Sequence, residues 1–225
     1  MDVLTKQTIA GFFSLFFVVC LMLFLPAWTI YYWQAWAYLA VFFIPVIAIT
    51  VYLFKYDKKL LESRVKAGPG AEKEKRQKII QAFASLFFIG VIMLPAFDHR
   101  FHWSNIPISL VLISDLIIVI GFTIVFFVFR ENSFTSATIK VDKEQKVVST
   151  GPYRFVRHPM YTGALLAMIF TPIALGSYWG ITCAFFLGIT IIVRLLDEEN
   201  YLKKNLDGYE EYCRKVRCHL VPFVW

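Results

Sequence analysis

Long apolar runs, separated by polar connections, set the pattern of this chain. Four such runs cover Ile9–Leu25, Ala37–Phe54, Ile79–Phe97 and Ile108–Phe129. A helix needs roughly 20 apolar residues to cross the hydrocarbon core of a bilayer, with a range of about 17–25. Each run meets that length, and none carries the strict alternation of a half-buried strand. The pattern therefore predicts an all-α fold, a polytopic membrane helical bundle.

Two further apolar arms follow late in the chain. The first continues from Tyr161 to Leu175, the chain turns at Gly176-Ser177, and the second covers Tyr178–Leu196. Each arm is barely long enough to span, so residues 159–196 are predicted to form a tight helical hairpin. The number of transmembrane helices is accordingly expected to be five to six.

Composition and charge support a membrane location. Of the 225 residues 58% are hydrophobic, and the mean hydropathy of +0.61 is too high for a soluble domain of this length. Lys and Arg gather in the connections that begin at Lys55, Arg130 and Asp197. We therefore read the net charge of +7 as the positive-inside pattern, with both termini cytosolic, and not as a nucleic-acid partner. The expected location is a cell inner membrane or its equivalent.

Three polar features are interpreted as structural. Asp115 lies within an apolar run, where a charge costs about 2.5–3.5 kcal/mol, so it should face protein. The Cys213, Cys218 and His219 group does not have the spacing of a standard metal site, and no third ligand is near the His99 and His102 pair. We expect no metal.

The central strip, Gly151–Gly163, is a polar and doubly basic segment between apolar runs. Pro159 disfavours helical geometry at His158 and is itself favoured at the first helical position. The strip therefore predicts a helix that starts at Pro159. Free backbone N–H groups at such a start, beside Arg154 and Arg157, suit an anionic or nucleotide-like ligand.

A second polar group stands where the last apolar arm ends. Arg194 and Glu198 are four residues apart and share a helical face, and Glu199 follows directly. Spacing alone leaves two interpretations open, a juxtamembrane salt bridge and a part of the ligand site.

Together these motifs resemble the isoprenylcysteine carboxyl methyltransferases and their bacterial relatives, with phospholipid methyltransferases as more distant kin. The resemblance rests on Gly151-Pro152-Tyr153, Arg157-His158-Pro159-Met160-Tyr161 with Gly163, Arg194-x3-Glu198-Glu199-x2-Leu202, Gly208-Tyr209-x2-Tyr212, and Val216 before Leu220-Val221-Pro222. It covers the last third of the chain by motif and the earlier spans only by hydropathy.

The resemblance implies a membrane-embedded enzyme that transfers a methyl group from S-adenosyl-L-methionine to a lipid-like acceptor, such as the carboxylate of a prenylcysteine. It implies that Glu198 contacts the cofactor, that Arg194 faces the acceptor, and that the acceptor enters from the bilayer. The residues implied to line the cofactor pocket are Val147, Val148, Tyr153, His158, Met160 and Tyr161. The segment around Asn132–Lys140 aligns poorly with the family, so no role is carried over to it.

The chain is expected to divide into two parts. Residues 1–130 would hold the first four transmembrane helices and a cytosolic loop at 55–78, broken by Gly68-Pro69-Gly70. That loop is interpreted as a solvated connection and not as a substrate lid. Residues 131–225 would form the cofactor-binding catalytic region, with the hairpin and a cytosolic C-terminal helix.

Acceptor chemistry separates the possible reactions. A carboxylate is already ionised at neutral pH and needs no base, and Arg194 is suited to hold it by a bidentate fork. An amine is protonated and needs a base, for which Glu198 and Glu199 are the nearby candidates. The acceptor atom and the oligomeric state stay open.

Two other functions share part of the pattern. Membrane sterol reductases carry a similar Arg-His-Pro-x-Tyr element and would use NADPH, whose extra phosphate would attract Arg154 and Arg157. A membrane scaffold or carrier without catalysis would use the central strip only as a basic loop. The Glu198-Glu199 pair and the short chain favour the methyltransferase.

Overall fold

The computed structural model describes residues 3–65, 75–135, 141 and 145–225. These residues form eight α-helices and a short 3-10 helix, η1, and they contain no strand, which confirms the all-α prediction. The elements are α1 (Val3–Ala27), α2 (Trp33–Tyr56), α3 (Lys58–Val65), α4 (Lys75–Phe101), α5 (Ile108–Glu131), η1 (Gly151–Arg154), α6 (Pro159–Ala174), α7 (Gly180–Asn205) and α8 (Tyr209–Lys215).

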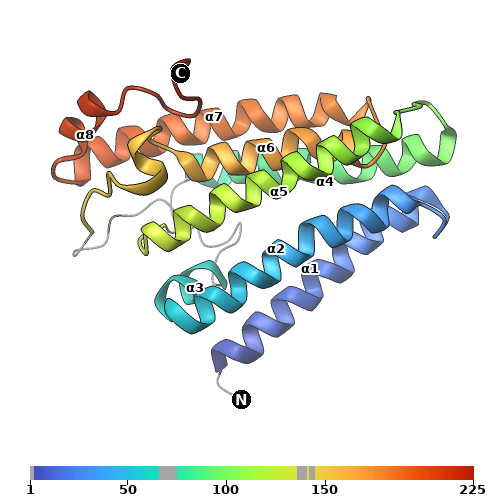
Figure 1. Ribbon diagram of the computed structural model, residues 1–225, viewed down its shortest axis with the longest axis horizontal. Coiled ribbons are helices and arrows are strands. Elements are labelled where there is room, and N and C mark those ends of the chain that lie inside the picture. Colours follow the sequence, from blue (N-terminus) through green and yellow to red (C-terminus); the bar gives the residue numbers. More distant parts are fainter. Residues whose placement is uncertain (1–2, 66–74, 136–140, 142–144) are drawn as a thin grey trace.

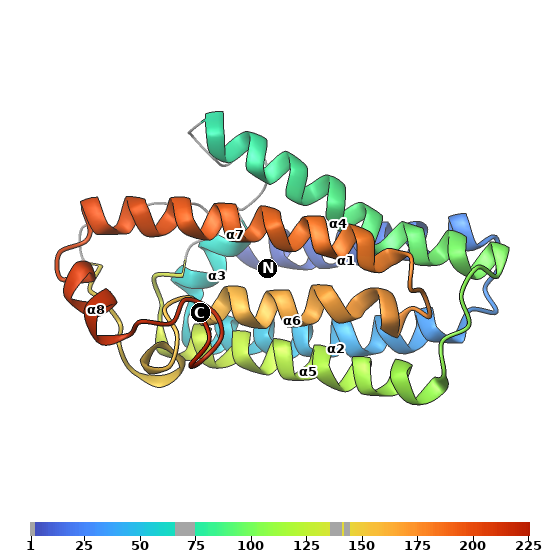
Figure 2. The same ribbon diagram turned by 90° about the horizontal axis from the view of Figure 1, so that it is seen from above.

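Five of the helices, α1, α2, α4, α5 and α7, are long and apolar enough to cross a membrane. The prediction of an integral membrane protein is therefore confirmed, and the five candidate spans match the lower bound of the expected five to six. α6 has 16 residues and rises only about 24 Å, less than the roughly 30 Å of a hydrocarbon core. It packs between longer neighbours as the short arm of the predicted hairpin (Figure 2).

Several helices extend beyond the predicted spans. α4 continues through Asp98–Phe101, beyond the predicted run that ends at Phe97, and α2 already begins at Trp33, ahead of the predicted run that starts at Ala37. α7 runs past Leu196 to Asn205, because no Gly or Pro interrupts the charged segment. Hydropathy thus marks where the apolar stretch ends, whereas the helix can continue beyond it.

The expectation of a solvated loop at 55–78 is wrong for its first part. Residues 58–65 form α3, whose N-terminus is capped by Asp57: the Leu60 N–H donates to Asp57 Oδ1 at 3.0 Å. Leu60 and Leu61 are buried in a core that also contains Leu4. The predicted Gly68-Pro69-Gly70 break lies outside the described residues, as do residues 136–140 and 142–144 of the connection that begins at Arg130.

Consecutive long helices run in opposite directions, so the segments that carry the candidate site residues lie at one end of the bundle. α3, η1 and α8 all lie at this end, on the left of Figure 1, together with the start of α6 and the end of α7. The start of α1 also lies there, since Leu4 packs in the same core as Tyr153 and Tyr212. The first described residues and the C-terminal segment therefore lie at the end of the bundle that holds the central strip; which side of the membrane this is remains a prediction.

α5 and α6 approach each other closely at two glycines. A Cβ at Gly163 would lie 2.5 Å from the Gly121 carbonyl oxygen, and one at Gly121 would lie 2.6 Å from the Gly163 carbonyl oxygen. Small residues of this kind let membrane helices pack backbone to backbone. The contact fixes α6, and therefore the central strip, against α5.

Asp115 behaves as predicted. It is buried among the helices of the bundle and is near Tyr38, whose hydroxyl lies 3.4 Å from Thr171 Oγ1. A carboxyl at this depth is thus turned away from lipid, as its insertion cost requires.

Candidate active site

The backbone of the central strip pairs with the C-terminal segment. The Arg157 N–H donates to the Cys218 carbonyl at 2.9 Å, and the His158 N–H donates to the His219 carbonyl at 3.0 Å. α6 then starts at Pro159, as predicted, and Thr162 Oγ1 donates to the Leu220 carbonyl at 2.8 Å. Residues about 60 positions apart are thereby fixed side by side at the start of α6.

Beneath this pairing lies a buried charge cluster centred on Glu199. Its Oε1 accepts from Arg157 Nη1 at 2.8 Å and from Lys203 Nζ at 2.7 Å. Nε2 of His219 lies 3.2 Å and Nε2 of His158 lies 3.5 Å from Glu199 Oε2. Burying a charge is costly unless it is paired, so the cluster holds the central strip against α7.

His219 belongs to the edge of the same cluster. Its ring stacks on Trp225, and Arg157 Nη2 lies 2.7 Å from its Nε2. Burial and the neighbouring Arg157 guanidinium lower the pKa of His219 below its usual value. The neutral imidazole is therefore the form that fits this position.

Tyr153 forms a buried junction on the other side of the strip. Asn132 Nδ2 donates to its hydroxyl at 3.1 Å, and the Tyr212 hydroxyl donates to its carbonyl at 2.7 Å. Burial raises the pKa of the Tyr153 phenol well above its usual range, so it is neutral at physiological pH. These bonds join the end of α5, η1 and α8.

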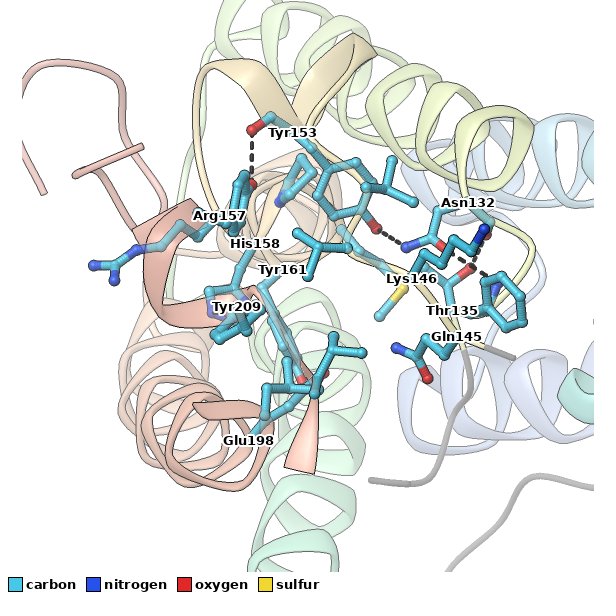
Figure 3. A pocket seen from close by; sticks show the side chains of 18 residues that line it. Asn132, Thr135, Gln145, Lys146, Tyr153, Arg157, His158, Tyr161, Glu198 and Tyr209 are labelled. Atoms are coloured by element: carbon cyan, nitrogen blue, oxygen red, sulfur yellow. Dashed lines mark hydrogen bonds between the residues drawn. The ribbon is translucent and has the colours of Figure 1, made fainter. Parts of the chain in front are cut away.

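A small pocket of about 90 Å³ opens between these elements (Figure 3). Every residue for which the sequence analysis predicted cofactor contact lines it: Val147, Val148, Tyr153, His158, Met160, Tyr161 and Glu198. The structure thus brings the predicted set together, although their role in binding a cofactor stays a prediction.

Other lining residues of the small pocket were not predicted as a set. They are Asn132, Phe134, Thr135, Gln145, Lys146, Arg157, Pro159, Leu202, Leu206, Tyr209 and Tyr212. Tyr209 and Tyr212 carried a signal, since they belong to the quoted motif and repeat at helical spacing in α8. Asn132, by contrast, could not be predicted from the sequence, because its place in the pocket depends on the end of α5 packing beside Tyr153.

A large cavity of about 610 Å³ lies between the helices next to the small pocket. Its walls come from α2 to α7 and are mostly apolar. Arg64, Gln81, Arg194 and Glu198 supply its charged and amide groups. The apolar wall is formed by Phe42, Ala84, Phe88, Ile89, Phe122, Val125, Met160, Gly163, Ala164, Ala167, Met168, Leu187 and Ile191, with Ser85 and Tyr161 completing the lining.

Met160, Tyr161 and Glu198 line both the small pocket and the large cavity. Within this shared wall the Tyr161 hydroxyl donates to Glu198 Oε2 at 2.6 Å. The two spaces are therefore neighbours, separated by a side-chain contact between the start of α6 and the charged end of α7.

Arg194 lines the large cavity and not the small pocket. Its Nη1 donates to Gln81 Oε1 at 3.0 Å and lies 3.4 Å from Gln77 Oε1. Gln77 in turn donates to Asp197. The two glutamines are four residues apart on one face of α4.

The two adjacent carboxylates have different environments. Glu199 is only 3% exposed, is held by the charge cluster and lines neither space, whereas Glu198 lines both. The sequence analysis could not separate them. The choice follows from the rotation of α7, which turns consecutive side chains about 100° apart.

Five helices long and apolar enough to span, with a small pocket at one end that adjoins a mostly apolar cavity, define an integral membrane protein with two neighbouring cavities. Residues 110–207 match the family described as phospholipid methyltransferase. This segment begins in α5 and ends just after α7, and it is a methyltransferase domain. The chain is accordingly a membrane methyltransferase. A comparison with curated proteins gives no match.

Proposed function

We propose that the protein transfers a methyl group from S-adenosyl-L-methionine, bound in the small pocket, to a lipid-like acceptor in the large cavity. The observation that carries this proposal is the wall common to both spaces, formed by Met160, Tyr161 and Glu198. Transfer between two bound molecules needs their reacting atoms within about 3–3.5 Å of each other. The reacting atoms of the two molecules can approach each other at this wall, because it is only one side chain thick.

The residues of the small pocket fit the proposed cofactor. A sulfonium cation suits a carboxylate such as Glu198 and the ring face of an aromatic such as Tyr161. Asn132, Gln145 and Lys146 offer hydrogen-bond donors for the carboxylate and hydroxyl groups of the cofactor. When bound, the cofactor supplies an activated methyl group.

The volume of the small pocket adds a condition. Small-molecule sites usually enclose about 300–1,000 Å³, and the described walls enclose about 90 Å³. Binding of a nucleoside-sized cofactor therefore requires the pocket to widen. The shared wall is the direction in which widening brings the cofactor toward the large cavity.

The large cavity fits the acceptor. Its volume lies within the usual range for ligand sites, and its long apolar lining suits an isoprenoid or acyl chain. Arg194 stands at its polar end, fixed by Gln81, where it would hold an acceptor carboxylate. We infer that the acceptor is the carboxylate of a prenylcysteine-like or other lipid-like molecule.

A phospholipid amine is a second candidate acceptor, and the match to phospholipid methyltransferases favours it. An ammonium group must lose a proton before it attacks the methyl group. Within the described residues Glu198 is the one carboxylate that lines the large cavity, so it is the base that this reaction would use.

The geometry argues against the NADPH-dependent alternative. Arg157, one of the two arginines expected to attract the extra phosphate, is buried and bonded to Glu199, to the Arg217 carbonyl and to His219. Its guanidinium points away from the small pocket (Figure 3). Arg154 is exposed and lines neither space.

The test is methyl transfer by the purified protein. Labelled S-adenosyl-L-methionine is offered with a panel of S-prenylcysteines, phosphatidylethanolamine and a neutral prenol. We expect label in a prenylcysteine methyl ester, and its loss in Glu198→Gln but not in the control Glu210→Gln, which is exposed on α8. Label in phosphatidylethanolamine alone would establish the amine reaction instead. Tight binding of NADPH without affinity for S-adenosylhomocysteine would overturn the proposal.

A further inference from the structure

Arg64 reaches the large cavity from α3, a helix that none of the quoted motifs includes. Its Nη2 lies 3.2 Å from the Met160 sulfur, and its guanidinium lies 4.6 Å from the centre of the Phe129 ring. The side chain thus lies against the start of α6, which also contributes Tyr161 to the shared wall. It does not line the small pocket.

The partners of Arg64 leave most of its hydrogen-bonding capacity unused. A guanidinium has five N–H donors, and a thioether sulfur is a weak acceptor. Arg157, which is more fully buried, bonds instead to a carboxylate, a carbonyl and an imidazole. Within the described part of the chain Arg64 makes no ion pair, although it is close enough to Glu198 to be affected by its charge.

The position is also partly buried. Burial lowers the pKa of Arg64 from its usual value, and the nearby Glu198 and tyrosines oppose that shift. A guanidinium remains charged in proteins even so. A guanidinium that lines a mostly apolar cavity, with a weak sulfur acceptor and an aromatic ring as its direct contacts, gains from an anion brought to it.

We propose that Arg64 binds an anionic oxygen group of the acceptor, a carboxylate or a phosphate, at the polar end of the large cavity. The inference rests on the proposed function and narrows its substrate class. Arg64 from α3 and Arg194 from α7 are the two cations that line this cavity among the described residues. Lipids with an anionic group near the reacting end are thus selected over neutral sterols and prenols.

Binding measurements without the methyl donor test this directly. The probes are two matched pairs: an S-prenylcysteine and its methyl ester, and phosphatidic acid and diacylglycerol. We expect the charged member of one pair to bind wild-type protein at least about tenfold more tightly, the effect of one charge-assisted hydrogen bond. The pair that shows the preference identifies carboxylate or phosphate as the anion.

Three variants assign the preference to Arg64. Arg64→Gln should lose about tenfold or more in affinity for the charged probe and leave the neutral probe unchanged. Arg64→Lys should retain part of the preference, because it keeps the charge but loses the planar fork. Arg130→Gln is the matched control: Arg130 also lies over a phenylalanine, Phe127, but is exposed and lines neither space.

The outcomes separate this inference from the proposed function. Absence of methyl transfer in wild-type protein defeats the proposed function, whatever the probes show. Equal affinity of wild-type protein for both members of both pairs overturns the role of Arg64, even if methyl transfer is observed. S-adenosylhomocysteine binding reports whether Arg64→Gln folds. If Arg64→Gln does not bind it, Arg64→Lys is measured in its place. In either case, a preference for the charged probe equal to that of Arg130→Gln overturns the inference.

Discussion

The Tyr161 hydroxyl donates a 2.6 Å hydrogen bond to Glu198 Oε2, across 37 positions of sequence. The bond links the first turn of α6 to the charged end of α7, in the wall between the small pocket and the large cavity. The start of α6 and the end of α7 therefore meet where the proposed reaction takes place.

Removal of this hydrogen bond should slow the reaction. Tyr161→Phe keeps the ring but leaves Glu198 without its donor, and a hydrogen bond to a charged group contributes about 1.5–3 kcal/mol. We expect kcat for methyl transfer to fall by about tenfold or more, with S-adenosylhomocysteine affinity changed little. Tyr178→Phe, exposed at the opposite end of the bundle, is the control. Equal rates for the two variants would argue against a role for the bond.

The adjacent glutamates should give opposite phenotypes. Glu199→Gln leaves Arg157 buried without its counter-ion, and breaking a buried pair costs about 3–5 kcal/mol. Its main effect should be a lower unfolding temperature in detergent. Glu198→Gln should unfold close to wild type but lose methyl transfer. A stable, active Glu199→Gln protein would contradict the structural role of the charge cluster.

The tight contact between α5 and α6 predicts a further stability effect. Gly163→Ala places a Cβ 2.5 Å from the Gly121 carbonyl, a backbone atom that cannot rotate away. Overpacking of this kind costs about 1–3 kcal/mol, so the unfolding temperature should fall. Gly188→Ala on α7 is the matched control, because the nearest atom to its Cβ lies 3.8 Å away. Equal unfolding temperatures would show that α6 can shift freely.

Stability should depend on pH through His219. Its pKa in the folded protein lies below its usual 6.5, so the unfolded chain takes up the proton first as pH falls. The stabilising contribution is full above about pH 6.5 and is lost as pH falls through the folded pKa. Arg157, His158 and Lys203 disfavour the protonated ring, and Glu199 favours it.

Unfolding temperatures measured between pH 7.5 and 5.5 check this dependence. His219→Gln cannot take up the proton, so the fall seen in wild type should be smaller in this variant. His102→Gln, exposed at the other end of the bundle, should keep the wild-type slope. The idea fails if the His219 and His102 variants have the same slope.

Local sequence patterns predicted much of the fold and of the candidate site. Apolar runs located the spanning helices, and Pro159 fixed the start of α6 to the residue because its ring both blocks the preceding turn and suits the first helical position. The Arg-His-Pro-x-Tyr element and the Glu198-Glu199 pair allowed several lining residues of the small pocket to be predicted, since each is local in sequence and repeats a known motif.

Contacts between distant segments could not be read in the same way. Nothing near Arg64 in sequence indicates that α3 folds back onto Met160, and the loop that contains it was expected to be solvated. The same applies to Gln77 and Gln81, whose partner Arg194 lies more than 100 positions away. Such pairings depend on how the spans pack, and hydropathy reports only where the spans are.

A structure of the protein bound to S-adenosylhomocysteine would test the shared wall most directly. The prediction is that the sulfur of the ligand lies beside Tyr161 and Glu198 and faces the large cavity, with the adenosine among the residues of the small pocket. A ligand bound elsewhere, or one whose sulfur faces away from Glu198, would contradict methyl transfer between these two spaces.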